Sequence, residues 1–122
     1  MTPVRGAASF SPADRLHNSA EFRYLQRNGA RAQGSHFVVY AGRFPGEDAS
    51  RLGVTVSKRV GIAVIRNRIK RRVRETYRLI LRAMLQPGIS LVVIARAGAG
   101  ELTSEAIGGE LKSAILAVAR RL

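Results

Sequence analysis

Hydrophobic residues recur at helical spacing through the middle of the chain. The positions concerned are Ile62, Ile65, Ile69, Val73 and Ile80. At about 3.6 residues per turn, they fall on one side of a helix. The pattern therefore predicts a helix from about residue 63 to about residue 85, with this stripe facing the core and Pro87-Gly88 ending it.

Shorter apolar runs predict two strands before this helix. Residues 30–44 contain His36-Phe37-Val38-Val39-Tyr40, which places Phe37 on one face and Tyr40 on the other. Residues 51–57 form the second strand, with Leu52, Val54 and Val56 on one face. The turn residues Phe44-Pro45-Gly46-Glu47-Asp48 lie between them and predict a hairpin.

The remaining segments predict one more strand and two more helices. Residues 89–95 are apolar on both faces, which is typical of a central strand. Asn18 and Glu21 match a capping box, and Gly29 is a suitable stop for the short helix that follows. Thr103 can cap a last helix running to about Arg120. The apolar stripe of that helix is Ile107, Leu111, Ile115 and Val118.

The predicted order is α-β-β-α-β-α, an α+β sandwich in which helices pack on a small mixed sheet. The sheet order stays open at this point. The 122 residues suffice for one domain with a real core. We expect a flexible segment over residues 1–13 and a single domain over residues 14–122.

Charge gives the first indication of a partner. The chain has 21 Lys and Arg against eight Asp and Glu, a formal net charge of +13. On the predicted central helix, Arg66, Lys70, Arg74 and Arg78 are successive i,i+4 neighbours, and Glu75 is the only acid between residues 58 and 78. Like charges at this spacing disfavour an isolated helix. The pattern therefore favours a polyanionic partner over a merely solvated face.

No protein catalytic centre is evident. There is no cysteine, His17 and His36 are isolated, and the eight acids form no recognisable dyad. A phosphate-binding glycine loop is missing. No apolar run is long enough for a membrane span, and the first residues lack a secretory signal. We therefore expect a cytoplasmic nucleic-acid-binding protein without a metal site of its own.

Several kinds of basic protein remain as alternatives. Helix-turn-helix, zinc-finger and zipper signatures are absent, and aromatics near the predicted sheet favour unpaired RNA over DNA. A ribosomal or RNA-chaperone protein and a DNA-compacting protein would share the charge. A membrane-surface helix is disfavoured, because Ile65, Ile69 and Val73 are needed for the core.

Residues 51–78, RLGVTVSKRVGIAVIRNRIKRRVRETYR, closely resemble the signature of the bacterial ribonuclease P protein component. That family has a strand ending in VS-K-[KR], followed by VGxAVxRNRxKRxxRE. Upstream counterparts are Arg15-Leu16, Glu21-Phe22, Gly29 and Phe37-Val38-Val39-Tyr40. The resemblance covers about residues 15–97.

The resemblance implies the protein subunit of a ribonucleoprotein whose RNA is the catalyst. That enzyme cleaves precursor tRNA to generate the mature 5′ end, using divalent metal ions such as Mg²⁺. One protein is expected per RNA, with neither DNA nor a membrane as partner. Asn67 is a candidate for the second shell of a metal ion. The expected contacts to the RNA subunit are Lys58, Arg59, Arg66, Asn67, Arg68, Lys70, Arg71 and Arg74.

The resemblance also implies a cleft between the first helix and the sheet that binds the single-stranded 5′ leader of the substrate. The matching candidates are Phe10, Phe22, Phe37, Tyr40 and His36. Some relatives have an aromatic residue where this chain has Gln26, so stacking on the leader is expected to be weaker there or to be replaced by hydrogen bonding. The family fold further implies a left-handed βαβ crossover around the central basic helix.

Overall fold

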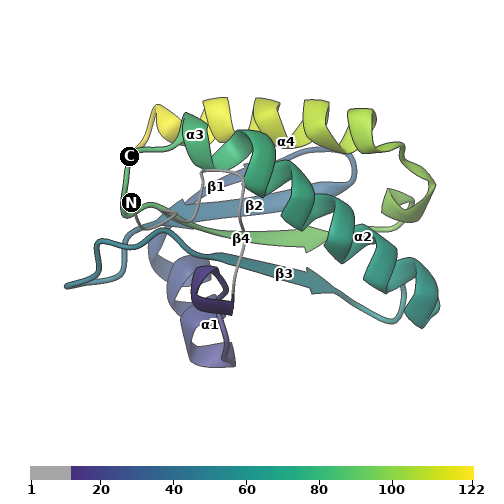
Figure 1. The fold of residues 1–122 in the computed structure, drawn as a ribbon, viewed down its shortest axis with the longest axis horizontal. Coiled ribbons are helices and arrows are strands. Elements are labelled where there is room, and N and C mark those ends of the chain that lie inside the picture. Colours follow the sequence, from purple (N-terminus) through teal and green to yellow (C-terminus); the bar gives the residue numbers. More distant parts are fainter. Residues whose placement is uncertain (1–11) are drawn as a thin grey trace, which may run out of the picture.

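The structure is a computed structural model that describes residues 12–122. It contains a four-stranded sheet with helices on both faces (Figure 1). Short 3-10 helices are η1 (Pro12–Asp14) and η3 (Ala99–Glu101). The strands are β1 (Ala30–Gln33), β2 (Phe37–Gly42), β3 (Leu52–Val56) and β4 (Ser90–Ala95). The other helical segments are α1 (Ser19–Asn28), α2 (Ala63–Thr76), the π-helical turn η2 (Tyr77–Leu81), α3 (Arg82–Met84) and α4 (Ser104–Ala119).

The strand order is β1-β2-β4-β3. Strand β4 is antiparallel to β2 and parallel to β3. The predicted hairpin between residues 30–44 and 51–57 is therefore wrong, because β4 lies between those two strands. Strand β4 is apolar on both faces, as is typical of a central strand, and it pairs with β2 on one side and with β3 on the other. The real hairpin joins β1 to β2 through a turn in which the Gly34 N–H donates to the Phe37 carbonyl at 2.8 Å.

The connection from β3 to β4 passes through α2, η2 and α3. In Figure 1 both strands run from left to right, β3 lies below β4, and α2 crosses in front of them. Seen along the strands, this path turns anticlockwise as it advances, so the crossover is left-handed. About 98% of such connections are right-handed. The left-handed crossover implied by the family resemblance is thus present.

The central helix continues from Ala63 to Met84 but changes its winding at η2. A π turn inserts one extra residue, so the inward positions after Val73 shift along the chain. Tyr77 and Leu81 are fully buried, whereas Ile80 is 38% exposed. Ile62, before the first turn, is 69% exposed. The prediction that Ile62 and Ile80 face the core is therefore wrong, while Ile69 and Val73 do face it.

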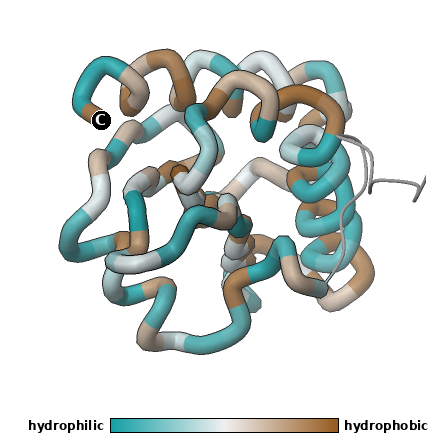
Figure 2. Tube along the Cα trace, turned by 60° about the vertical axis from the view of Figure 1, so that its left-hand side comes forward, coloured by the Kyte–Doolittle hydropathy of each residue, from teal (hydrophilic) through white to brown (hydrophobic). Residues whose placement is uncertain are grey.

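Two hydrophobic clusters hold the layers together. The larger lies between the sheet and the layer of α2 and α4, and it contains Phe37, Val39 and Leu91. The smaller lies under α1 on the opposite face, around Leu25 and Val92. Hydrophobic and hydrophilic positions alternate along the helices, as amphipathic helices require (Figure 2).

The outer helices begin as predicted. The Asn18 side chain accepts from the Glu21 N–H at 2.9 Å in a complete capping box, and Gly29 caps the end of α1. A Cβ at Gly29 would lie 2.7 Å from the Leu25 carbonyl oxygen, so only glycine fits there. The Thr103 hydroxyl accepts from the Ala106 N–H at the start of α4. The predicted stripe of α4 is buried.

Candidate RNA interface

The outer face of α2 carries most of the predicted RNA-contacting side chains. Ile69 and Val73 anchor the opposite side of the helix in the core. Asn67 and Arg71 are exposed, whereas the partly exposed cations of this face are Arg66, Lys70 and Arg74. Lys58 and Arg59 are exposed in the turn that precedes the helix. The structure thus brings most of the predicted set onto one continuous side.

Arg68 lies on the opposite flank of α2 from Arg66 and Lys70. Its Nη2 donates to the Gly100 carbonyl at 3.1 Å. One turn later, Nη1 of Arg72 donates to the Leu102 carbonyl at 2.7 Å. These bonds tie α2 to the loop after β4. Arg68 therefore makes a contact within the protein that the sequence motif did not indicate. Its predicted contact with the RNA subunit stays a prediction.

A groove of about 410 Å³ runs along the cationic face of α2 beside the segment that follows η1. Its lining residues are Arg15, Asn67, Arg71, Arg74, Glu75 and Arg78. Arg15 is held at the edge of β3, where it forms a bridge with Leu52. Partial burial, and then the positive charge of Arg15, lower the pKa of the Arg74 guanidinium. This groove concentrates positive charge where two chain segments meet.

The expected contacts to the RNA subunit did not include Arg15 or Arg78, although both line this groove. Arg78 follows Arg74 by one turn, and helical spacing had already placed it in the row of like charges that indicated a polyanionic partner. Arg15 lies in an irregular segment with no period, and only the bridge to Leu52 brings it beside α2. Long-range placement of this kind has no local signal in the sequence.

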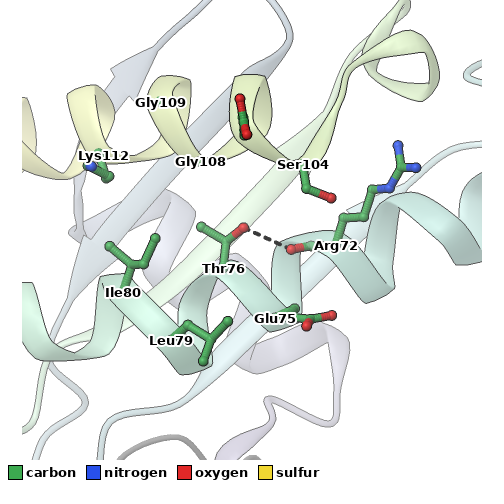
Figure 3. A pocket seen from close by; sticks show the side chains of 10 residues that line it. Arg72, Glu75, Thr76, Leu79, Ile80, Ser104, Gly108, Gly109 and Lys112 are labelled. Atoms are coloured by element: carbon green, nitrogen blue, oxygen red, sulfur yellow. Dashed lines mark hydrogen bonds between the residues drawn. The ribbon is translucent and has the colours of Figure 1, made fainter.

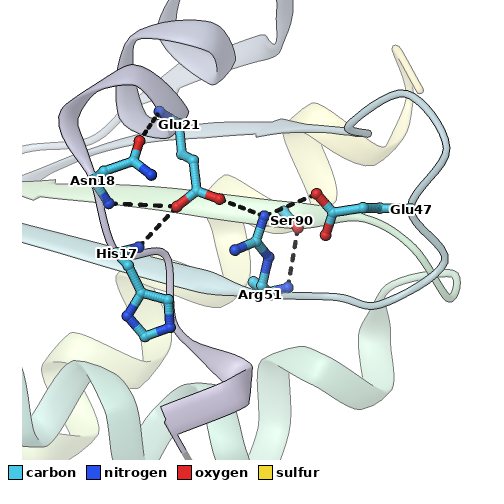
Figure 4. A network of polar contacts seen from close by, with 6 residues as sticks. All are labelled: His17, Asn18, Glu21, Glu47, Arg51 and Ser90. Carbon is cyan, nitrogen blue, oxygen red and sulfur yellow. Dashed lines mark hydrogen bonds and ion pairs between the residues drawn. The ribbon is translucent and has the colours of Figure 1, made fainter.

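On the other face of the sheet, a polar network fixes the position of α1 (Figure 4). Glu21 closes the capping box and pairs with Nη2 of Arg51 at 2.6 Å. Glu47 pairs with the same nitrogen at 2.9 Å, and the Arg51 N–H donates to the Ser90 hydroxyl. Burial by itself raises the pKa of the Glu21 carboxyl. Hydrogen bonds from the His17 N–H and the Arg51 guanidinium outweigh burial and hold that pKa below its ordinary value.

Phe22 packs from α1 onto β3 at Gly53. A Cβ at Gly53 would lie 2.5 Å from Phe22 Cζ, so the ring requires glycine beneath it. Beside the ring is a cleft of about 500 Å³ between α1 and β3. Its lining residues are His17, Asn18, Ser19, Phe22, Arg23, Gln26 and Thr55. The cleft combines one aromatic wall with several hydrogen-bonding side chains.

A row of side chains across the sheet continues this cleft. Val38 pairs with Ile94 across β2 and β4, and Thr55 pairs with Ile94 across β3 and β4. All three lie on the face that carries α1, because the buried faces of these strands point to the other core. Val38 and Ile94 are half-buried and Thr55 is exposed. These three side chains extend the surface of the cleft from β3 across β4 to β2.

The five predicted leader-binding residues do not form one cluster. Phe22 lines the cleft, and the half-buried Tyr40 lies on the same sheet face, where its hydroxyl accepts from Arg31 Nε at 3.2 Å. Phe37 is 0% exposed in the larger core, so its prediction as a binding residue is wrong: alternation along β2 turns it away from α1.

The other two candidates also lie apart from the cleft. The His36 ring is held 2.9 Å from the Glu110 carboxylate on α4, which belongs to the opposite layer. Phe10 lies outside the described residues.

A further groove, of about 500 Å³, separates α2 and η2 from α4 (Figure 3). Leu79 and Ile80 line one side and Gly108 and Gly109 the other. At its bottom the Thr76 hydroxyl donates to the Arg72 carbonyl at 2.9 Å. Among residues 12–122, no three His, Asp or Glu side chains come together as metal ligands. No helix in that part of the chain is long and apolar enough to cross a membrane.

Comparison with known proteins agrees with this geometry. The family model "Ribonuclease P" matches residues 10–119. The ribonuclease P protein component of Syntrophobacter fumaroxidans is 39% identical over 115 residues, covering 93% of this chain and 94% of that protein. The corresponding protein of Desulforapulum autotrophicum is 42% identical over 107 residues, covering 87% of this chain and 89% of the relative.

Solved structures show the same fold. The RNase P protein of Staphylococcus aureus superposes with a TM-score of 0.74 at 33% identity, covering 87% of this chain and 94% of that one. The RNase P protein from Thermotoga maritima gives 0.70 at 31% identity, covering 81% and 92%. Sequence motif, left-handed crossover and comparisons agree, and the chain belongs to the ribonuclease P protein family.

Proposed function

We propose that this chain binds a catalytic RNA and the 5′ leader of precursor tRNA, and that the RNA carries out the cleavage. The observation that carries the proposal is the cationic face of α2, which Ile69 and Val73 hold against the core while its charges point outward. The residues proposed to contact the RNA subunit are Lys58, Arg59, Arg66, Asn67, Arg68, Lys70, Arg71 and Arg74. Their charges attract phosphates and reduce the repulsion between two RNAs.

The leader is proposed to follow the cleft beside α1. Phe22 offers an aromatic wall there, and aromatic side chains stack unpaired bases without strong sequence preference. The half-buried Val38, Ile94 and Tyr40 extend the surface across the sheet. Gln26 lines the cleft and supplies an amide for hydrogen bonds in place of a second ring.

The divalent ions of the reaction are proposed to be held chiefly by RNA. Residues 12–122 bring together no set of side chains suited to a metal cage. Mg²⁺ keeps several water ligands and binds phosphate oxygens, which the RNA provides. The exposed Asn67 amide could accept a hydrogen bond from such a water. We further propose that one copy of this protein, folded as a single domain, binds each RNA and that the complex assembles in the cytoplasm.

Binding to the RNase P RNA tests the cationic face. A filter-binding titration should show affinity falling by at least about 100-fold for a fourfold rise in monovalent salt, because several phosphate contacts release counterions. Arg71→Gln should weaken binding while circular dichroism stays unchanged, because Arg71 is exposed. Arg120→Gln, an exposed charge at the end of α4, is the matched control. A flat salt response would contradict the proposal.

The leader cleft is tested separately with two substrates. Tyr40→Ala should weaken the affinity of the holoenzyme for precursor tRNA and leave its affinity for mature tRNA unchanged, because only the precursor carries a leader. Val54→Ala, on the opposite face of β3, is the control for a general effect on the sheet. Equal losses for both tRNAs would remove Tyr40 from the leader site.

A further inference from the structure

Two arginines from distant parts of the chain approach each other where the segment after η1 meets α2. Arg15 and Arg74 line the same groove, together with Asn67 and Arg71. The positive charge of Arg15 acts on the Arg74 guanidinium, which is itself partly buried. Within residues 12–122, Arg74 makes no ion pair and no side-chain hydrogen bond.

Such an arrangement costs free energy in the isolated protein. Partial burial removes water from a guanidinium, and a nearby like charge adds repulsion. Among residues 12–122, the only carboxylate that lines the groove is Glu75, whose Oε1 lies 3.5 Å from Nη2 of Arg78. Glu75 thus shares its charge with Arg78, one turn beyond Arg74. An anion between Arg15 and Arg74 would remove the repulsion.

We propose that Arg15 and Arg74 together hold one phosphate group of the RNA subunit, with Asn67 and Arg71 beside it. The proposal rests on the proposed function and adds a residue outside the central motif to its binding surface. Guanidinium groups suit this task because their paired N–H donors match the oxygens of a phosphate. Asn67 contributes an amide donor from the same side of the groove.

Contacts with β3, the edge strand of the sheet, hold Arg15 in place. The Leu16 N–H donates to the Leu52 carbonyl at 3.0 Å, and Arg15 forms a bridge with Leu52. Asp14, 4% exposed, lies 3.7 Å from Nη1 of Arg82 at the start of α3. These contacts hold the segment on both sides of Arg15. The phosphate site therefore joins residues 14–16 to α2 across the edge of β3.

A double-mutant cycle on the binding of full-length protein to RNase P RNA tests this site. Arg15→Gln and Arg74→Gln should each weaken binding by about 10-fold, the order expected for a hydrogen-bonded charge. If both arginines hold one phosphate, the double variant should lose little more RNA affinity than the single variant that binds more weakly. The control cycle pairs Arg15→Gln with Arg120→Gln, whose effects should multiply.

The outcomes separate the two proposals. If wild-type protein fails to bind the RNA, the proposed function is wrong. If it binds and the losses from Arg15→Gln and Arg74→Gln multiply, only the shared phosphate site is overturned. If Arg15→Gln loses its circular dichroism signal, it is replaced by Arg15→Lys, which keeps the charge but lacks the paired donors. Its cycle with Arg74→Gln must show the same coupling for the site to stand.

A second measurement uses inorganic phosphate with the protein alone. Phosphate should raise the melting temperature of wild-type protein above that in chloride at equal ionic strength, because ligand binding stabilises the folded state. Arg15→Gln and Arg74→Gln should each lose most of this increase, and Arg120→Gln should keep it. An equal increase in all four proteins would contradict a specific site.

Discussion

Individual contacts between α1 and the sheet determine the shape of the proposed leader cleft. Phe22 rests on β3 only because Gly53 lacks a side chain, and Glu21 links the start of α1 to Arg51. Neither contact involves a group that does chemistry. Both fix the angle and depth at which α1 meets the sheet, and so the width of the cleft.

Replacing Gly53 with alanine should displace Phe22. The new Cβ would lie 2.5 Å from Phe22 Cζ, and overpacking of this kind costs about 1–3 kcal/mol in the free energy of unfolding. Gly109→Ala is the matched control, because a Cβ there meets nothing within 4 Å. It should stabilise α4 by up to about 1 kcal/mol. Urea denaturation of both variants measures the difference, and a neutral Gly53→Ala would refute the close contact.

Acid should weaken the anchoring of α1 through Glu21. The folded state lowers the pKa of this carboxyl, so its contribution to stability is complete above the pKa of the unfolded chain. That contribution disappears as pH falls through the folded-state pKa. Melting temperatures of wild type and Glu21→Gln should therefore differ most near neutral pH and converge in acid. A difference that grows as pH falls would reverse the assigned sign.

The π turn in the central helix has the largest effect at the scale of elements. It moves the buried position from Ile80 to Leu81 and turns Leu79 and Ile80 toward the groove beside α4. Regular spacing predicts the helix and its first three turns correctly. It cannot predict the inserted residue, because winding here depends on packing against the sheet and α4.

Substitutions at the two neighbouring positions distinguish the π turn from a regular helix. Leu81→Ala should lower the free energy of unfolding by about 2–5 kcal/mol, as for a fully buried leucine. Ile80→Ala should cost about 1 kcal/mol or less, because its side chain is already 38% exposed. Chemical denaturation gives both values. The reverse order would mean that the helix continues regularly through residue 80.

Sheet order is the part of the fold that lies beyond local patterns. The turn residues at 44–48 do reverse the chain, but they cannot specify which strand becomes the neighbour of β2. That choice follows from β4, which begins at Ser90, 42 residues after the end of the turn at Asp48, and buries both faces. The left-handed crossover is predictable only from the family resemblance, since general rules favour the other hand.

At the scale of the whole molecule, the two proposed RNA-binding surfaces lie on different layers of the fold. Helix α2 packs on one face of the sheet and α1 on the other (Figure 1). The cationic side of α2 therefore belongs to one layer, and the cleft beside α1 belongs to the opposite one. The motif residues of the first surface are predictable because helical spacing groups them. Arg15 and the row of Val38, Ile94 and Thr55 are not, because strand pairing brings them into place.

Cleavage of precursor tRNA by the reconstituted particle tests the central claim most directly. The RNase P RNA is incubated with precursor tRNA at low magnesium, with and without this chain, and release of the 5′ leader is followed. The chain should accelerate correct 5′ cleavage, because its charges assist the approach of two polyanions when few divalent ions are present. RNA that binds the chain and yet cleaves no faster would contradict the proposed function.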